Sequence, residues 1–311
     1  MRCLITGGAG FIGRHLVAAL AAAGGYELRV LDDDSTGDRR ALAGSGAAFV
    51  QGDLRDRAAL DAALPGCTAV IHLAAATGVA ACTADPRRSL DVNAMGTLEL
   101  LEGCRRHGVL RVIAASTAGA LLDADGGVVD AHRPARPQSP YGAGKAALEA
   151  LLSAYAGSFG LETCALRLGN VYGPGASHKD GVVLRFLRAH RAGRPPVIHG
   201  DGEQARDFVY VLDVVAGIRQ ALDSGAQGTF QLGSGRPTTL RELVAVLDEV
   251  LVPGPLPAIH VPRPSGEAGD SHCDIAPAHE AFGYVPHTPL VTGLARTWAW
   301  VRAGEPAGAG A

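Results

Sequence analysis

The sequence predicts an α/β protein with a doubly wound parallel sheet of the Rossmann type and a smaller C-terminal α/β lobe. Two observations lead to this prediction. In the first half of the chain, short runs that are apolar throughout alternate with longer helical patterns, as expected of parallel strands buried on both faces and joined by right-handed βαβ crossovers. A glycine-rich turn, Thr6–Gly13, also separates the first expected strand from the first expected helix, which is where such sheets bind dinucleotides.

The expected elements follow from this alternation. Glycine and proline punctuate the chain more densely after residue 171, where the regular pattern loosens. One later apolar run is nevertheless expected to return to the main sheet. The expected strands are residues 2–6, 27–31, 48–51, 69–73, 111–115, 163–168 and the returning 229–232. The expected helices are residues 11–23, 55–64, 86–107, 141–159, 182–191, 212–222, 240–251 and 290–302.

We divide the chain into two interleaved regions on this pattern. A chain of 311 residues is long for one domain and short for two ordinary ones. Residues 1–171 are expected to form a dinucleotide-binding domain, to which a segment near 207–235 returns. Residues 172–304 are expected to form mainly a substrate-binding lobe, and 305–311 a flexible tail.

Composition and charge argue against several classes of protein. The net charge of −3 offers no basic face for nucleic acid, and no apolar run reaches the roughly 20 residues of a membrane span. The start of the chain lacks the basic and apolar regions of a secretory leader. Because the six cysteines are scattered without a CxxC pair, we expect reduced thiols, a cytoplasmic location and no metal site.

The turn Thr6–Gly13 has the spacing of a dinucleotide-binding loop. Gly7, Gly10 and Gly13 permit a tight turn, close approach of a pyrophosphate and close contact between helix and strand. The N–H groups at the start of the following helix would bind the phosphates. A plain strand-to-helix turn is the alternative, but strand, loop, helix and second strand all occur in the expected order.

Charged residues after the second and third strands indicate which dinucleotide binds. Asp32 follows the second strand, where a carboxylate would bind the ribose hydroxyls and repel a 2′-phosphate, so NAD is favoured over NADP. Arg39 and Arg40 could reach such a phosphate, although solvated surface arginines are the simpler interpretation. Two roles remain open for Asp53: contact with the adenine amino group, or the N-cap of the helix 55–64.

A tyrosine and a lysine four residues apart are the candidate reacting groups. Tyr141 and Lys145 would lie on one face of a helix that begins after a Ser-Pro pair. Only two of the 28 basic residues are lysines, which points to a lysine that arginine cannot replace. A nearby ammonium and a positively charged nicotinamide would lower the pKa of the tyrosine and make it a usable base. Ser116 and Thr117 follow the fifth strand, where a hydroxyl could bind the same substrate oxygen; strand-end capping is the alternative.

Beyond these residues, the chain carries a series of short motifs in a fixed order. They are TGGAGFIG at 6–13, GDL at 52–54, HLAA at 72–75, Asn93 with GT at 96–97, SPY at 139–141, LR at 166–167, NVYGP at 170–174, GDGEQ at 200–204 and RDF at 206–208. From Thr6 to about Val301, the chain therefore resembles the NAD-dependent epimerase/dehydratase family of extended short-chain dehydrogenases/reductases. Within that family it is most similar to UDP-glucose 4-epimerases and UDP-glucuronate 4-epimerases.

The resemblance implies an enzyme that binds NAD and a UDP-sugar. Tyr141 resembles the catalytic base, Lys145 its partner, and Thr117 the hydroxyl that holds the sugar 4-oxygen, with Ser116 beside it. The implied cofactor contacts are Gly7, Gly10, Phe11, Ile12, Gly13, Asp32, Asp53, Leu54, Leu73, Ala74, Ala75, Asn93, Ser116, Tyr141 and Lys145. The implied substrate contacts near the sugar are Thr77, Val79, Thr117, Tyr141 and Arg185. Asn170 and Arg206 are implied at the diphosphate, with Arg263 as a further phosphate contact, Val197 and His199 around uracil, and Glu267 at the ribose; Val182 is a further implied substrate contact.

Three departures from the family pattern narrow the chemistry. The stretch 120–122 reads Ala-Leu-Leu instead of Val-Tyr-Gly, which leaves the sugar contacts there undefined. Pro264 replaces a phosphate-binding arginine, for which Arg263 would substitute. Sugar 4,6-dehydratases carry an Asp-Glu pair after the catalytic threonine, whereas Ala118 and Gly119 stand at these positions here. The last departure argues against dehydration.

The sequence thus predicts a UDP-hexose 4-epimerase. Tyr141 would take the proton of the sugar 4-hydroxyl, hydride would pass from C4 to NAD, and the turned 4-keto sugar would receive it on the opposite face. The alternatives are another NAD-dependent nucleotide-sugar oxidoreductase or decarboxylase, and a non-catalytic NAD-binding sensor or scaffold. The substituent at C6 stays open, since either Arg185 or Lys179 could bind a carboxylate. The resemblance also implies a homodimer through the helices 86–107 and 141–159.

Overall fold

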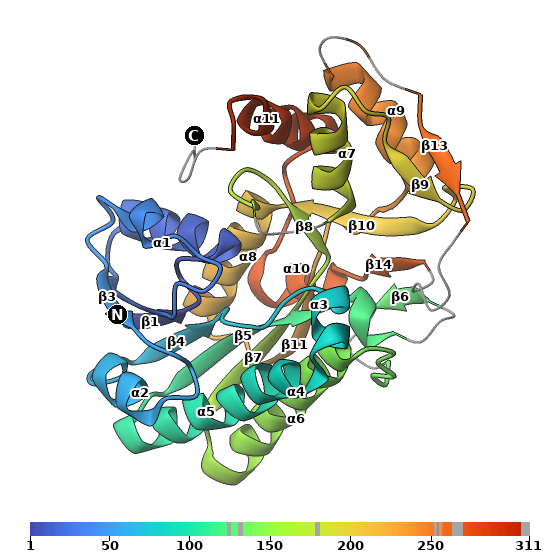
Figure 1. Cartoon of the computed structure of the whole chain (residues 1–311). Coiled ribbons are helices and arrows are strands. Elements are labelled where there is room, and N and C mark those ends of the chain that lie inside the picture. Colours follow the sequence, from blue (N-terminus) through green and yellow to red (C-terminus); the bar gives the residue numbers. More distant parts are fainter. Residues whose placement is uncertain are drawn as a thin grey trace.

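The computed structural model describes residues 1–122, 126–129, 133–177, 181–251, 254, 257–262 and 270–305. The strands of the central sheet are β1 (Arg2–Thr6), β2 (Glu27–Asp32), β3 (Ala48–Gln51), β4 (Ala69–His72), β5 (Arg111–Thr117), β7 (Glu162–Leu168) and β11 (Gly228–Leu232). All seven run parallel, in the order β11-β7-β5-β4-β1-β2-β3 (Figure 1). The strand order reverses between β1 and β4, which is the switch point at which doubly wound sheets bind ligands. The predicted fold class and the return of a late strand to the sheet are confirmed.

Helices cover both faces of this sheet (Figure 1). They are α1 (Phe11–Ala23), α2 (Arg57–Ala63), α4 (Pro86–Leu90), α5 (Gly96–His107), α6 (Pro140–Phe159) and α8 (Val211–Ser224). The helices α1 and α8 close one apolar core, which includes Ile5 and Ile113 of the sheet. The helices α2, α5 and α6 close a second core, which includes Leu4 and Val112. Neighbouring residues of β1 and of β5 therefore enter opposite cores, which explains why these strands are apolar throughout.

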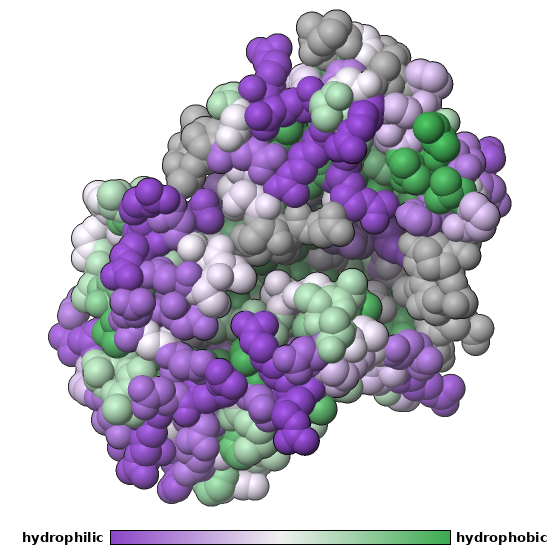
Figure 2. All heavy atoms as spheres, in the orientation of Figure 1, coloured by the Kyte–Doolittle hydropathy of each residue, from purple (hydrophilic) through white to green (hydrophobic). Residues whose placement is uncertain are grey.

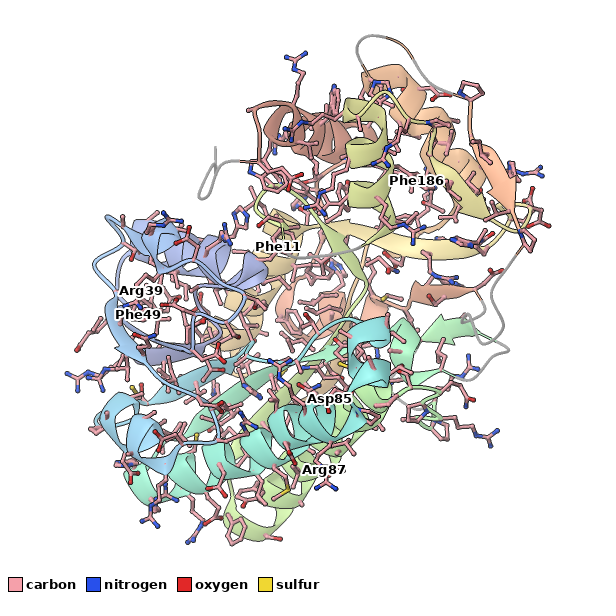
Figure 3. The ribbon with its side chains drawn as sticks, in the orientation of Figure 1. Phe11, Arg39, Phe49, Asp85, Arg87 and Phe186 are labelled. Carbon is pink, nitrogen blue, oxygen red and sulfur yellow. The ribbon has the colours of Figure 1, made fainter. Side chains whose placement is uncertain are left out.

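The second half of the chain builds a lobe on one side of the sheet. Its elements are β8 (Asn170–Tyr172), α7 (Val182–Arg191), β9 (Val197–His199), β10 (Ala205–Tyr210), β12 (Pro237–Thr239), α9 (Leu240–Val250), β13 (Ile259–Val261) and α11 (Leu290–Arg302). The strands form a sheet in the order β12-β10-β8 and a separate pair, β13-β9. Phe186 and Trp298 lie in the lobe's own core, together with Phe11 from the start of α1 (Figure 3). The surface is indented between the lobe and the sheet domain (Figure 2).

Two element boundaries differ from the prediction in ways that shape the site. The strand β5 continues to Thr117, so Ser116 and Thr117 are strand residues that pair with Arg167 and Leu168 of β7. The predicted helix 86–107 is interrupted between α4 and α5 by a π-helical turn, η2 (Asp91–Met95). Single π turns within helices occur frequently at functional sites.

Several short elements were not expected from the sequence. Two three-residue strands, β6 (Gly127–Val129) and β14 (Ser271–Cys273), pair with each other, and short helices form at α3 (Val79–Ala84) and α10 (Ala276–Phe282). Runs of this length have too few residues to show a hydrophobic period.

The helix α2 is capped by a residue other than the one proposed. Asp56 is the N-cap, and its carboxylate accepts a hydrogen bond from the backbone N–H of Ala58. Asp53 instead binds Arg55, through the backbone N–H at 2.8 Å and the guanidinium at 2.6 Å. The capping alternative for Asp53 is therefore wrong.

The structure also bears on the expectations for membrane spans, metal sites, cysteines and the C-terminal tail. In the part of the chain that the structure describes, no helix is long and apolar enough to cross a membrane, and no cluster of His, Cys, Asp or Glu could hold a metal ion. All six cysteines are buried, free thiols. Glu305, the first residue of the expected tail, pairs with Arg188 at 2.6 Å. Lys179, Arg263 and Glu267 lie outside the described residues.

Candidate active site

The glycine-rich turn leaves no room for side chains. Gly7 has a φ of +70°, and a Cβ there would lie 2.6 Å from the backbone nitrogen of Ala74. A Cβ at Gly13 would lie 2.2 Å from the Gly7 carbonyl oxygen, so α1 begins in direct contact with the turn. Gly10 is the N-cap of α1, with no side-chain hydrogen bond at the cap. A helix start of this kind is suited to a phosphate group.

Asp32 is fixed beside this turn at the end of β2. Its carboxylate accepts hydrogen bonds from the backbone N–H groups of Ala9 and Asp34, both at 2.9 Å. Burial is the main cause that raises the pKa of Asp32, and the neighbouring acids Asp33 and Asp34 add to it. Three consecutive carboxylates would repel a 2′-phosphate, which favours NAD over NADP.

The two arginines that could have bound a 2′-phosphate have acidic partners. Arg40 pairs with Asp38 at 2.9 Å. Arg39 pairs with Asp34 at 2.6 Å, and its guanidinium lies 5.1 Å from the centre of the Phe49 ring (Figure 3). These contacts support the simpler interpretation of both arginines as surface residues.

A buried histidine joins β1, β4 and α5 beneath the site. His72 Nδ1 lies 2.8 Å from Thr6 Oγ1, and its Nε2 lies 3.1 Å from Thr97 Oγ1. Thr97 donates its own proton to the Asn93 carbonyl oxygen, so Nε2 carries the imidazole proton and Nδ1 accepts from Thr6. Burial, and then the charge of Lys145, lower the pKa of His72 to about 3. His72 therefore stays neutral and fixes the carboxyl ends of two strands.

Asn93 positions the loop that follows β4. Its side chain accepts from the backbone N–H of Ala76 at 2.8 Å and donates to the Ala76 carbonyl oxygen at 2.9 Å. Both functions of the amide are thus used on the loop that contains the expected cofactor contacts Leu73, Ala74 and Ala75. A Cβ at Gly144 would lie 2.8 Å from the Asn93 Cβ, so α6 packs directly on the π turn. The π turn therefore connects the loop after β4 to α6, which carries Tyr141 and Lys145.

The expected reacting groups come together at the carboxyl edge of the sheet. The hydroxyl of Thr117, at the end of β5, lies close enough to the phenol of Tyr141 to lower its pKa. The ammonium group of Lys145 donates a hydrogen bond to the Ala115 carbonyl oxygen at 2.8 Å. Ser139 caps α6 by accepting from the Gly142 N–H, so Tyr141 lies in the first turn of its helix. The structure thus brings Thr117, Tyr141 and Lys145 together as predicted.

Burial shifts the pKa values of Tyr141 and Lys145 in the directions that favour the neutral phenol and the neutral amine. It raises the pKa of Tyr141 to about 12, with the thiol of Cys82 as a second cause, while the Thr117 hydroxyl lowers it. It lowers the pKa of Lys145 to about 8, against the opposing effect of Glu149. The expected lowering of the tyrosine pKa is therefore not produced by the protein's own groups, and further positive charge is required.

The sequence did not single out Glu149 as a site residue. Its carboxylate accepts from the Ser116 hydroxyl at 2.5 Å and from the Arg167 guanidinium at 2.9 and 2.8 Å. Spacing would have indicated it, because Glu149 lies four residues after Lys145 and eight after Tyr141 on one helix. The likeness of the LR motif at 166–167 to the family identified Arg167 but assigned it no role.

The expected substrate contacts lie around the opening between sheet and lobe. Asn170 and Val182 line one pocket, together with Tyr172 and Phe208. His199 is on β9, and its buried Nδ1 has no hydrogen-bond partner among the described residues. The remaining described positions are Thr77 and Val79 at the start of α3, half-buried Arg185 on α7, exposed Val197 on β9 and half-buried Arg206 on β10.

Comparison with known proteins agrees with this geometry. Residues 3–233 match the model of the NAD dependent epimerase/dehydratase family. The chain belongs to this family. A UDP-glucose 4-epimerase of Mycolicibacterium smegmatis is 36% identical over 96% of this chain and 97% of its own length.

Two solved structures of family members share the whole fold. The UDP-glucose 4-epimerase of Thermotoga maritima, solved with UDP-glucose, matches with a TM-score of 0.90 and 33% identity, over 98% of this chain and 99% of that one. The UDP-glucose 4-epimerase of Thermus thermophilus, solved in complex with NAD, has a TM-score of 0.88 and 36% identity, over 97% and 99%. The predicted family is confirmed.

Proposed function

We propose that this chain is a nucleotide-sugar 4-epimerase that acts on a UDP-hexose with NAD as its bound cofactor. The observation that carries the proposal is the position of Tyr141 in the first turn of α6 beside Thr117 of β5, with the Lys145 ammonium one helical turn away on the Ala115 carbonyl oxygen. The tight turn at Gly7 and Gly13 and the fixed carboxylate of Asp32 fit the pyrophosphate and ribose of NAD.

Each reacting group has a role that its contacts define. When bound, oxidised NAD accepts hydride from the sugar C4 and returns it, and its positively charged ring favours the ionised form of Tyr141. Tyr141 takes the proton of the sugar 4-hydroxyl and gives it back at the end of the cycle. Thr117 orients that hydroxyl toward Tyr141. Lys145 retains N–H donors beyond its bond to Ala115, and these are available to the cofactor ribose.

Two alternatives fit the site less well. Dehydration needs an acid that can protonate the leaving oxygen, but Ala118 and Gly119 follow Thr117, and Ala118 is 3% exposed. A sensor or scaffold that binds NAD without turnover would need none of Thr117, Tyr141 and Lys145. Epimerisation uses all three, so we favour it.

The diphosphate and uracil are the substrate groups that this lobe would hold. Asn170 and Arg206 are proposed to bind the diphosphate, and Val182, Val197 and His199 to enclose uracil. His199 is half-buried and Val197 is exposed on β9, so both side chains present surface to a ligand.

Product analysis tests the proposed reaction. The protein is incubated separately with UDP-glucose, UDP-glucuronate and UDP-N-acetylglucosamine, and the products are separated by chromatography while NADH is followed by absorbance. We expect UDP-galactose or UDP-galacturonate to form without net NADH, which also identifies the C6 substituent. A 4-keto-6-deoxy sugar, or a pentose with release of carbon dioxide, would show that the epimerase assignment is wrong.

We also propose a cytoplasmic homodimer. The helical span from α4 to α5 packs along α6 on the outer face of the sheet domain (Figure 1). Leu90 and Met95 of this span are 41% and 49% exposed, as expected where a second copy covers them. Six buried, free thiols are typical of a reducing compartment.

A further inference from the structure

A half-buried carboxylate, that of Glu149, lies behind the reacting groups, and the proposed epimerisation assigns it no task. The Glu149 side chain is 13% exposed and the Arg167 side chain 7%. The residues Tyr141, Lys145 and Glu149 recur every four positions on α6, so they share one helical face that looks onto the sheet.

The contacts of Glu149 tie this helix to two strands at the edge of the sheet. Ser116 and Arg167 are register partners on β5 and β7, and both donate to the same carboxylate, at 2.5 Å and at 2.9 and 2.8 Å. Ser116 lies between Ala115, whose carbonyl accepts from Lys145, and Thr117, whose hydroxyl lowers the pKa of Tyr141. A displaced Ser116 would therefore move the partners of both reacting groups.

Several elements pack against Lys145, and the groups that they present to it are mostly uncharged. His72 of β4 is neutral, and the side chain of Asn93 in η2 is an uncharged amide. Cys82 of α3, which contributes a thiol, is a second cause after Glu149 that raises the pKa of Lys145. Burial raises the pKa of the Tyr141 phenol on α6 to about 12. Arg167 of β7 is paired with Glu149. Among the described residues, Glu149 is thus the ionised carboxylate that favours the charged form of Lys145 against the cost of burial.

We propose that Glu149 is a positioning residue of the active site, which fixes Ser116 at the sheet edge and maintains Lys145 as an ammonium ion. The effect of Glu149 on catalysis rests on the proposed epimerase function, because that reaction requires an ammonium ion beside the Tyr141 base. A purely structural ion pair between Glu149 and Arg167 would stabilise the fold without affecting Lys145.

The low lysine content of the chain allows the protonation of Lys145 to be measured directly by NMR. The chain has only two lysines, Lys145 and Lys179, so protein labelled with carbon-13 at the lysine Cε carbon gives two NMR signals. A Lys179→Arg variant assigns them. The chemical shift of the Lys145 signal, followed against pH, reports the midpoint of its protonation in the full protein without any need for turnover.

We expect the Glu149→Gln variant to lower this midpoint by about one pH unit or more, since the nearby negative charge is lost while the side-chain shape remains. Ser116→Ala removes a hydrogen bond without changing charge and should leave the midpoint unchanged. Glu102→Gln is the matched control, because Glu102 also accepts from an arginine, Arg105 at 2.9 Å, and a hydroxyl, Tyr155 at 2.7 Å. It should leave the midpoint unchanged too.

Three results would overturn the inference. The first is a wild-type midpoint in Glu149→Gln. The second is a wild-type midpoint in the double variant Glu149→Gln/Arg167→Met. In that case the lower midpoint of Glu149→Gln would come from the positive charge of Arg167, left without its carboxylate partner, and not from loss of the Glu149 charge. If Glu149→Gln does not fold, Glu149→Asp replaces it: withdrawing the carboxylate by one methylene should lower the midpoint part of the way, and no change would contradict the proposal.

Kinetics separate this inference from the proposed function. In the wild type, the rate of epimerisation should fall as the pH rises through about 8, where Lys145 loses its proton, and in Glu149→Gln this fall should begin at lower pH. If the wild type converts no UDP-sugar, the proposed function fails while the NMR result still stands. If the wild type is active and the pH profile of Glu149→Gln matches it, the inference fails alone.

Discussion

At the scale of single residues, Tyr141 and Lys145 carry opposite pKa shifts with one cause. Burial raises the pKa of Tyr141 to about 12 and lowers that of Lys145 to about 8. Both shifts favour the uncharged form, so the protein alone leaves the phenol protonated at neutral pH. We therefore expect Tyr141, as the proposed base, to become active only when positive charge accumulates beside it. Such a dependence would link proton transfer to the presence of the oxidised cofactor.

Tyr141→Phe tests the identity of the base. The substitution removes one hydroxyl and keeps the ring, so the fold and NAD content should be preserved. Loss of a general base typically lowers the rate by ~10²–10⁴, and no recovery is expected at high pH because the titrating group is gone. Turnover is measured by chromatography of UDP-glucose and UDP-galactose. Near-normal turnover in a folded variant would assign the base to another residue.

Lys145→Met tests the role of the ammonium through pH. In the wild type the ammonium is present below about pH 8 and is lost above it, so activity should decline on the alkaline side. The variant lacks this group, and its rate should be low, by on the order of 10². It should then rise with pH as the phenol of Tyr141 ionises. A variant whose activity declines at alkaline pH as in the wild type would contradict this role.

At the scale of elements, the glycine turn and the helix α6 were predictable because each has a sequence pattern set by local geometry. The continuous apolar strands were predictable for the same reason, since neighbouring residues enter cores on both faces of the sheet. The π turn was not, because its helical pattern continues through 91–95 and only packing against Gly144 distinguishes it. The pairing of Glu149 with Ser116 and Arg167 depends on three elements meeting, which no local pattern encodes.

Gly7→Ala tests the turn against a matched glycine at the end of α5. Gly7 and Gly108 have nearly equal φ values, +70° and +68°, and Gly108 is a left-handed C-cap; a Cβ at Gly108 meets nothing within 4 Å, whereas one at Gly7 lies 2.6 Å from Ala74. Both substitutions should cost about 1–2 kcal/mol for the left-handed conformation. Only Gly7→Ala should also displace the loop after β4 and abolish NAD binding. Thermal unfolding and the NAD content of purified protein measure the two effects, and equal NAD content in both variants would exclude this role for Gly7.

At the scale of the whole molecule, α1 connects the dinucleotide turn to the lobe. Phe11 belongs to the core of the lobe, and His15 Nε2 lies 2.8 Å from the Pro174 carbonyl oxygen just after β8. A Cβ at Gly175 would lie 3.3 Å from the Arg14 side chain, so the same loop packs closely on α1. The element that starts at the cofactor turn thus also fixes the entry to the lobe. We therefore expect the cofactor site at the glycine turn and the substrate site in the lobe to keep a fixed separation.

The outer face of the molecule exposes two large apolar side chains beside the π turn. Leu90 and Met95 are five residues apart across the π turn, where hydrogen bonds run from i to i+5, so both side chains project to the same side. In a two-fold dimer each residue contributes twice. Because Met95 is 49% exposed, burying the rest of its side chain contributes about half of the ~1.5–3 kcal/mol of a fully exposed one, per copy.

Met95→Arg should therefore convert the expected dimer to a monomer with its fold intact. Leu110→Arg is the control, since Leu110 is 64% exposed and lies outside these helices, so that variant should remain dimeric. Light scattering at micromolar concentration gives the mass of each form, and circular dichroism reports the fold. A wild-type protein that is already monomeric would refute the dimer, and a dimeric Met95→Arg would place the interface on another face.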